Sequence, residues 1–188
     1  MRVVNKEEFY NEESYFTEEI EKGALFIYPT DTIYGMGCDA LNTKSVEKIK
    51  KIKFRNASPF SVIAPSKKWI EENCTVGYEG VKWLEKLPGP YTLIFKTRKK
   101  CVSDAVNNRL GTLGVRIPNH WIKDFVNEIG VPIVTTSVNK SGSDFMTSVK
   151  DLDAEIKNSV SFILDEGEIK GKPSRIVDLR NKAKIIER

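Results

Sequence analysis

Short apolar runs alternate with amphipathic segments along the whole chain, and this alternation limits the fold more than any other feature. Eight runs read as β-strands, at residues 24–28, 59–65, 91–96, 112–118, 131–137, 161–165, 174–179 and 183–187. Most of the segments between them have the spacing of helices. Strands that alternate with helices are typical of layered α/β proteins. We therefore predict an α/β fold.

The helical segments carry their own start and stop signals. We expect a first helix capped by Asn5 and stopped by Gly23, and a second helix opened by Asn42 or Thr43. Two short helices should follow, one around residues 69–70 and one that Pro88 ends. A further helix should begin near residue 119 and end at Gly130, and a capping box at 148–151 should precede the last helix. The apolar stripes of these helices are interpreted as core.

Bulk properties indicate one globular domain, residues 1–188, in a reducing compartment. A chain of 188 residues with 40% hydrophobic residues is long enough for one sizeable core. Its net charge of +4 is too small to identify a nucleic-acid-binding protein. Three cysteines without C-x-x-C spacing argue against a disulfide framework or a zinc site. We see no signal peptide and no membrane-length apolar run, so we expect a cytoplasmic protein without membrane contact.

Common catalytic and nucleotide-binding motifs do not explain this sequence. Residues 35–40, GMGCDA, fit the G-x-G-x-x-A dinucleotide pattern, but six residues separate these glycines from the preceding strand. The phosphate-loop pattern G-x-x-x-x-G-K-[ST] is absent. With His120 as the only histidine, a Ser-His-Asp or Cys-His mechanism would lack its base, and we expect no metal site in the protein. Asp31 and Asp39 could assist Mg²⁺, although aspartates that form turns are commoner.

Several polar residues stand where strands or helices end. Lys53 and Arg55 stand together at the end of the lysine-rich helix, and Arg116 interrupts an otherwise apolar strand. A charged group in such a run needs an anionic partner, because burying it alone is costly. The segment TTSVN, residues 135–139, adds hydroxyls and an amide at the end of another strand. These groups suit phosphate or carboxylate recognition, but each also has a structural explanation as a helix end, salt bridge or turn.

The whole chain resembles the YrdC-like family, the L-threonylcarbamoyladenylate synthases. Six segments carry the resemblance in order: YPTDTIYGMGCDA, IKKIKFRNASPFSVI, LPGPYTLIF, GTLGVRIPNH, TTSVNKSG and KPSRIVDL. The resemblance implies a single-domain twisted mixed sheet with flanking helices and a large basic concave cavity. It also implies that Gly35 and Gly37 turn the chain at the floor of a nucleotide-binding concavity.

The implied reaction joins L-threonine, bicarbonate and ATP into L-threonylcarbamoyl-AMP and releases pyrophosphate. This nucleotidyltransferase step begins the threonylcarbamoyladenosine modification of tRNA, so a downstream tRNA threonylcarbamoyl transferase complex is an implied partner. Mg²⁺ would accompany the ATP. Because the carbamate of threonine is itself the nucleophile, the protein needs only to align two anions and neutralise their charge.

The family pattern assigns a role to individual residues. Thr32, Arg116, Thr135 and Ser174 would hold L-threonine, with Arg116 on its carboxylate. The ATP side would be lined by Lys53, Arg55, Thr112, Ser137, Asn139, Thr147 and Arg188. Lys53 and Arg55 are the candidate catalytic cations.

Departures from the family pattern, and two other functions, stay open at this point. Asn56, Ser58, Phe145 and Pro173 replace residues that are usual in the family, which puts substrate affinity in doubt. The chain could instead be a non-catalytic module that binds double-stranded RNA or tRNA through the lysine-rich helix. It could also be a family member that acts on another carbamoyl or phosphate compound.

Overall fold

The computed structural model describes residues 1–54 and 58–186, and in these residues the strands form one 11-stranded mixed sheet. The sheet order is β1-β9-β2-β3-β8-β4-β7-β6-β10-β11, and β5 pairs with β6 beside this path. The strands are β1 (Arg2–Val4), β2 (Phe26–Tyr28), β3 (Gly35–Gly37), β4 (Ser61–Ile63), β5 (Cys74–Thr75), β6 (Tyr91–Thr97), β7 (Thr112–Arg116), β8 (Ile133–Ser137), β9 (Phe162–Leu164), β10 (Arg175–Asp178) and β11 (Lys184–Ile186).

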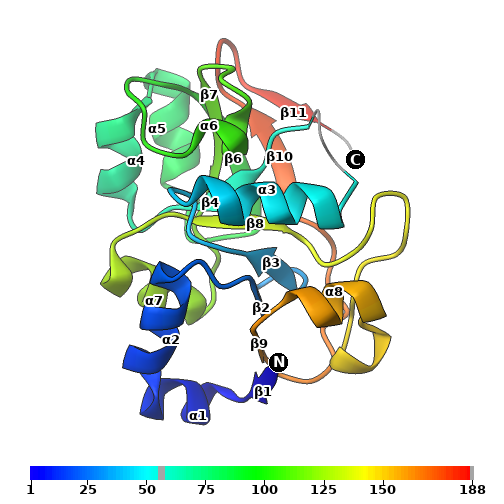
Figure 1. Cartoon of the computed structure of the whole chain (residues 1–188). Helices are drawn as coiled ribbons and strands as arrows, with labels where there is room; N and C mark the ends of the chain where they lie inside the picture. Colours follow the sequence, from blue (N-terminus) through cyan, green and yellow to red (C-terminus); the bar gives the residue numbers. More distant parts are fainter. Residues whose placement is uncertain (55–57, 187–188) are drawn as a thin grey trace.

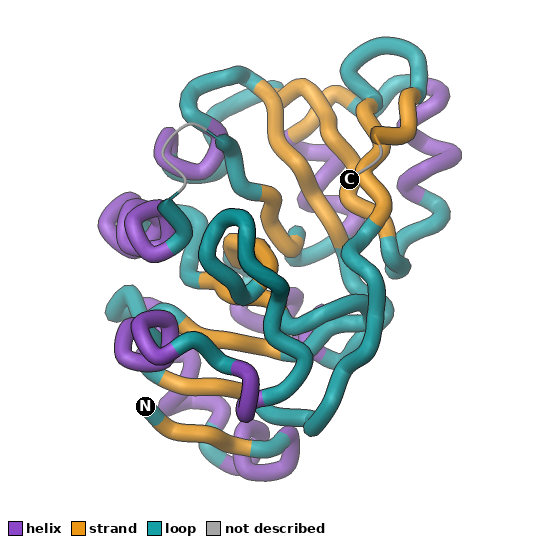
Figure 2. Tube along the Cα trace, turned by 90° about the vertical axis from the view of Figure 1, so that its right-hand side faces the viewer, coloured by secondary structure: helices purple, strands orange, loops and turns teal. Residues whose placement is uncertain are grey.

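The sheet mixes parallel and antiparallel pairs and is strongly twisted. β4 runs parallel to β7 and antiparallel to β8, while β6 runs antiparallel to β7 and parallel to β10. In Figure 1, β1, β2 and β9 lie in the lower half of the molecule, and β6, β7, β10 and β11 lie in the upper half. Figure 2 shows that the strands of the two halves run in clearly different directions. The α/β mixed sheet predicted from the sequence is confirmed.

Helices flank the sheet, and two of them begin at the capping residues that the sequence indicated. They are α1 (Lys6–Asn11), α2 (Glu13–Glu21), α3 (Thr43–Ile52), α4 (Lys67–Asn73), α5 (Tyr78–Leu84), α6 (Asp104–Asn107), α7 (Ile122–Ile129), the 3₁₀ helix η1 (Val149–Asp151) and α8 (Ala154–Ser159). Asn5 forms a capping box with Glu8, and Asn42 caps α3 through Ser45. Among the described helices, none is long and apolar enough to cross a membrane.

Four short strands and helices were not predicted, and several boundaries differ. The missed elements are β1, β3, β5 and α6, each two to four residues long. The first predicted helix is divided into α1 and α2 at Glu12. The helix expected from residue 119 begins at Ile122 instead. The capping box at Ser148 and Asp151 opens η1, and Asp153 caps α8.

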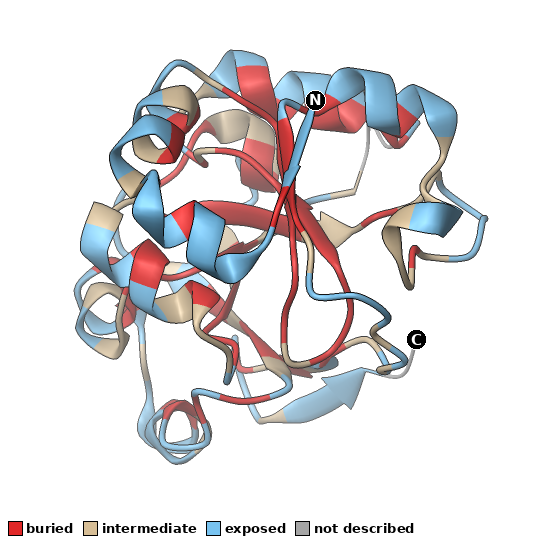
Figure 3. Cartoon of the chain, turned by 90° about the horizontal axis from the view of Figure 1, so that it is seen from below, coloured by how far each residue is buried: buried red, intermediate tan, exposed pale blue. Residues whose placement is uncertain are grey.

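Two clusters of buried side chains form the core. One centres on aromatic residues such as Phe9, Phe16 and Phe125, which join α1, α2 and α7 to the lower strands. The other includes Ile49, Phe95 and Val115 and fills the space around the central and upper strands. Figure 3 shows buried residues along the strands in the middle of the molecule and exposed residues on the outer faces of the helices. The sheet is therefore a rigid support for any side chain that its strands position.

Candidate active site

A cavity of about 630 Å³ lies over the strands β8, β4, β7, β6 and β10. The sheet forms the floor of the cavity. Alternate residues of each strand point to the same face of the sheet, so they can line the cavity together. Ser61, Thr92, Thr112, Gly114, Arg116, Thr135, Ser137 and Ser174 share the cavity lining with apolar residues such as Ile94 and Phe60. Hydroxyl groups and the Arg116 guanidinium therefore face a common space from segments that are far apart in sequence.

Arg116 is the charged group at the end of β7 that reaches into this cavity. The residue is 5% exposed. Its Nη2 donates a hydrogen bond to Asp31 Oδ1 at 2.6 Å, and both Nη atoms lie 3.3 Å from Thr32 Oγ1. Within the described part of the chain, its Nε is buried without a hydrogen-bond partner. Since a guanidinium has five N–H groups, this arginine keeps donors for an incoming anion.

Asp31 holds the Arg116 guanidinium in place. Its Oδ2 accepts a hydrogen bond from the Asn119 backbone N–H at 2.9 Å, so the carboxylate joins the loop before β3 to the loop after β7. The Arg116 side chain is 6% exposed and the Asp31 side chain 11% exposed. Desolvation by burial lowers the pKa of Arg116, and the negative charge of Asp31 opposes that change. Asp31 is therefore the counter-charge of Arg116, a role beyond the turn formation that the sequence favoured.

The other three residues predicted to hold threonine lie in the same region as Arg116. Thr135 and Ser174 line the cavity, and both are nearly buried. Thr32 is buried next to Arg116, with its Oγ1 2.9 Å from Thr30 Oγ1, and Thr30 is the residue of this pair that lines the cavity. The structure brings these residues to one place, while their contact with threonine stays a prediction.

The residues predicted for the ATP side divide into two groups. Thr112 and Ser137 line the cavity. Asn139 and Thr147 do not belong to its lining. Asn139 Nδ2 donates to the Ser143 carbonyl at 2.7 Å, and Thr147 Oγ1 donates to Asp151 Oδ2 at 2.5 Å. Both residues lie in the segment that follows β8, so they stabilise that segment as the structure stands.

Lys53 is buried, at 2% exposed, and its ammonium group is turned toward the segment after β8. Its Nζ donates to the Ser137 carbonyl at 2.6 Å and to the Asn139 carbonyl and Oδ1, each at 2.8 Å. The Ser137 hydroxyl also donates to Asn139 Oδ1, at 2.6 Å. Lys53 therefore joins the end of α3 to the 137–139 turn. In this geometry Lys53 stabilises the 137–139 turn. Its catalytic role stays a prediction.

Other predicted residues lie outside the described residues. Arg55, Asn56 and Arg188 belong to this group. Of the departures from the family pattern, Ser58 and Pro173 line the cavity, and Phe145 is half-buried outside it.

Gly35 and Gly37 do not turn the chain, so this expectation was wrong. Both lie in β3, which pairs with β2 and β8. A Cβ on Gly37 would lie 2.3 Å from the Val134 carbonyl oxygen, and one on Gly35 would lie 2.8 Å from the Tyr28 ring. The glycines are required because β3 packs closely against the backbone of β8 and the ring of Tyr28. Gly35 nevertheless lines the cavity, as expected of a residue at its floor.

His120 forms a contact that stabilises a loop. Its Nε2 is 2.9 Å from Glu166 Oε2, and Trp121 Nε1 donates to the other oxygen of the same carboxylate. Across the described residues, no group of three or more His, Cys, Asp or Glu could hold a metal ion.

Thr92, Tyr34 and Arg180 are among the cavity residues that sequence reasoning missed. Thr92 Oγ1 is 2.7 Å from Ser174 Oγ, and Tyr34 donates through its hydroxyl to the Gly167 carbonyl at 2.8 Å. The alternation of side chains along the strand 91–97 could have revealed Thr92, because it lies two residues before the cavity-lining Ile94. Arg180 follows β10 and pairs with Asp178 at 2.6 Å.

Comparisons with known proteins identify the family. The model of the Sua5–YciO–YrdC proteins, described as telomere recombination, matches residues 18–188. The chain belongs to the Sua5–YciO–YrdC family. A relative from Methanocaldococcus jannaschii, named a putative threonylcarbamoyl-AMP synthase, is 36% identical over 95% of this chain and 85% of its own length. The resemblance found in the sequence is thereby confirmed, as is the classification as a synthase-type enzyme, since several relatives carry that name.

Solved Sua5–YciO–YrdC structures have the same fold. Sua5 of P. abyssi complexed with L-threonine has a TM-score of 0.86 and 28% identity, and the match covers 99% of this chain. The chain spans 56% of that Sua5 structure. E. coli YciO has a TM-score of 0.82 at 24% identity, covering 99% of this chain and 92% of its own, and supports the fold alone.

Proposed function

We propose that this protein forms L-threonylcarbamoyl-AMP from L-threonine, bicarbonate and ATP, with release of pyrophosphate. The observation that carries the proposal is Arg116, a buried guanidinium in a hydroxyl-lined cavity whose Nε has no partner among the described residues. The named relatives and the Sua5 structure with L-threonine support it. The product would enter the threonylcarbamoyladenosine modification of tRNA through a downstream transferase complex.

The amino acid would bind on the Arg116 side of the cavity. Its carboxylate would accept hydrogen bonds from the Arg116 N–H groups that Asp31 and Thr32 leave available, a charge-assisted contact. Thr135 and Ser174 enter the same region from β8 and from the residue before β10. The site therefore offers a fixed cation for the carboxylate and hydroxyls for the rest of the molecule.

The nucleotide would lie on the Thr112 and Ser137 side of the cavity, with Mg²⁺ entering as part of the MgATP substrate. The threonine amine takes up carbon dioxide, and a carbamate oxygen attacks the α-phosphorus while pyrophosphate leaves. Both reactants are anionic, so fixed cations and aligned donors lower the barrier. Arg55 and Lys53 are the proposed cations, and Lys53 also holds Ser137 in place through the 137–139 turn.

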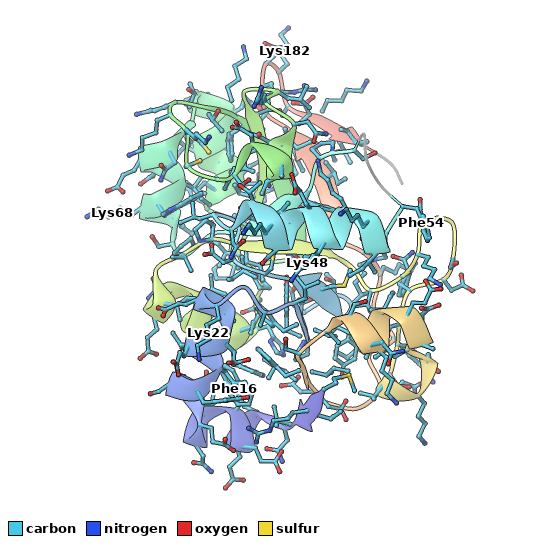
Figure 4. All side chains as sticks on the ribbon, viewed as in Figure 1. Phe16, Lys22, Lys48, Phe54, Lys68 and Lys182 are labelled. Atoms are coloured by element: carbon cyan, nitrogen blue, oxygen red, sulfur yellow. The ribbon has the colours of Figure 1, made fainter. Side chains whose placement is uncertain are left out.

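Pyrophosphate release tests the proposal. The assay contains L-threonine, bicarbonate and MgATP, and each is omitted in turn. Release should need all three, and Lys53→Ala and Arg55→Ala should each nearly abolish it. Lys48→Ala is the matched control for Lys53, because Lys48 is exposed on the outer face of α3 (Figure 4) and does not line the cavity.

Two outcomes would replace the proposal. Pyrophosphate release that ignores threonine would remove the synthase activity. An RNA-binding module would instead show no release and an RNA affinity that falls steeply with salt, with a log–log slope of about 0.7–0.9 per phosphate neutralised.

A further inference from the structure

Thr92 and Ser174 form a pair of hydroxyl groups inside the cavity. Thr92 lies on β6 and Ser174 directly precedes β10, and these parallel strands pair Thr92 with Ile176. The two oxygens are 2.7 Å apart, and both residues line the cavity although they are almost fully buried, at 3% and 6% exposed. Both side chains line the cavity, so a ligand bound there can contact the pair.

The chemistry of the pair suits a ligand hydroxyl. Two hydroxyls bring two donors and four acceptor lone pairs, and their mutual bond uses one donor and one lone pair. One donor and several lone pairs remain. A ligand hydroxyl both donates and accepts, so it can satisfy both functions at once, whereas a methyl group or hydrogen in its place would leave them buried and unsatisfied.

The pair also stands beside the group that would hold the substrate carboxylate. The antiparallel register that pairs Leu93 with Val115 places Thr92 next to Arg116 on the neighbouring strand. Gly114 keeps this part of the floor open, since a Cβ there would lie 3.5 Å from Thr92 Cγ2 and 3.0 Å from Ser61 Cβ. An amino acid bound through Arg116 therefore has its side chain within reach of the hydroxyl pair.

We propose that Thr92, through its bond to Ser174, is a specificity-determining residue that recognises the side-chain hydroxyl of the amino-acid substrate. The proposal rests on the synthase function above. The site selects a β-hydroxy amino acid because its two partnered hydroxyls need a third to complete their hydrogen bonds.

A double-mutant cycle between protein and substrate tests this inference. Pyrophosphate release is measured as kcat/KM for L-threonine and for L-2-aminobutyrate, which lacks the hydroxyl, with wild type, Thr92→Val and Thr92→Ser. Wild type should prefer threonine by about 100-fold or more, and Thr92→Val should shrink that ratio by about 10-fold or more without changing KM for ATP. Thr92→Ser should restore the preference, because it returns the hydroxyl. Thr75→Val, the same change on an exposed residue of β5, should leave the ratio as in wild type.

Each outcome decides between the two proposals. If wild type releases pyrophosphate with threonine but Thr92→Val keeps the full preference, the inference is wrong and the synthase function stands. If wild type does not respond to threonine, the proposed function fails first. If Thr92→Val is inactive, the binding of L-threonine to Thr92→Val and to Thr92→Ser is measured by calorimetry. A folded Thr92→Val that binds L-threonine as tightly as Thr92→Ser does would overturn the inference.

Discussion

Two ion pairs of equal length allow a direct test of how Arg116 is held. Arg116 Nη2–Asp31 Oδ1 and Arg180 Nη2–Asp178 Oδ2 both measure 2.6 Å. The first pair is buried, with side chains 6% and 11% exposed, and the second is 44% and 18% exposed. The substitutions Asp31→Asn and Asp178→Asn make the same chemical change in these two environments.

We expect Asp31→Asn to cost far more stability. Removing one partner of a buried ion pair costs about 3–5 kcal/mol, because the other charge stays buried without compensation. Asparagine keeps one oxygen, which Arg116 and the Asn119 N–H must share, so the lower end, about 3 kcal/mol, is appropriate. For a chain of this size that corresponds to a fall in Tm of roughly 6–12 °C. Asp178→Asn should cost at most about 1 kcal/mol.

Denaturant unfolding of both variants and of wild type at pH 7 provides the measurement. Unchanged m-values would show that the difference lies in stability. Equal losses for the two substitutions, or a loss below about 1 kcal/mol for Asp31→Asn, would refute the view that Asp31 is the buried counter-charge of Arg116.

Three further predictions concern other parts of the molecule. Gly171→Ala should lower kcat/KM for threonine at least about 10-fold, because its Cβ would lie 1.6 Å from the Thr32 carbonyl oxygen and push the segment before Ser174 away, whereas Gly77→Ala, with nothing within 4 Å, should have no effect. Burial raises the pKa of Cys74 to about 12 and raises that of Cys38 as well, so iodoacetamide at pH 8 should modify both thiols after unfolding but not in the folded protein, as mass spectrometry would show. Burial, and then the nearby Glu128, raises the pKa of Glu13, so ionised Glu13 destabilises the fold above that pKa. Glu13→Gln should therefore raise Tm at pH 7, and the gain should disappear as the pH falls below about 4.3, where Glu13 is protonated in both states; a gain that persists at low pH would contradict this reasoning.

The regular part of the fold could be predicted because local signals and tertiary packing agree there. β6, β7 and β8 are apolar runs, and α3 has a capping residue and an amphipathic stripe. β3 could not be predicted, because Gly35-Met36-Gly37 has little strand propensity of its own. It becomes a strand through pairing with β2 and β8 over the ring of Tyr28.

The site was predictable in its residue types but less so in its contacts. A charged residue inside an apolar strand predicted that Arg116 needs an anion, yet its partner Asp31 lies 85 positions away and no local pattern indicates it. Lys53 looked like an available cation at a helix end. Its three oxygen partners come from residues 137 and 139, which only the folded chain brings near.

The most direct test of the account follows the carbon of bicarbonate. The protein is incubated with ¹³C-bicarbonate, L-threonine and MgATP, and the nucleotide products are analysed by mass spectrometry. We predict a threonine–carbonyl–AMP adduct that carries one ¹³C and forms together with pyrophosphate. Pyrophosphate released without any labelled adduct would contradict the claim that this cavity joins the carbamate of threonine to AMP.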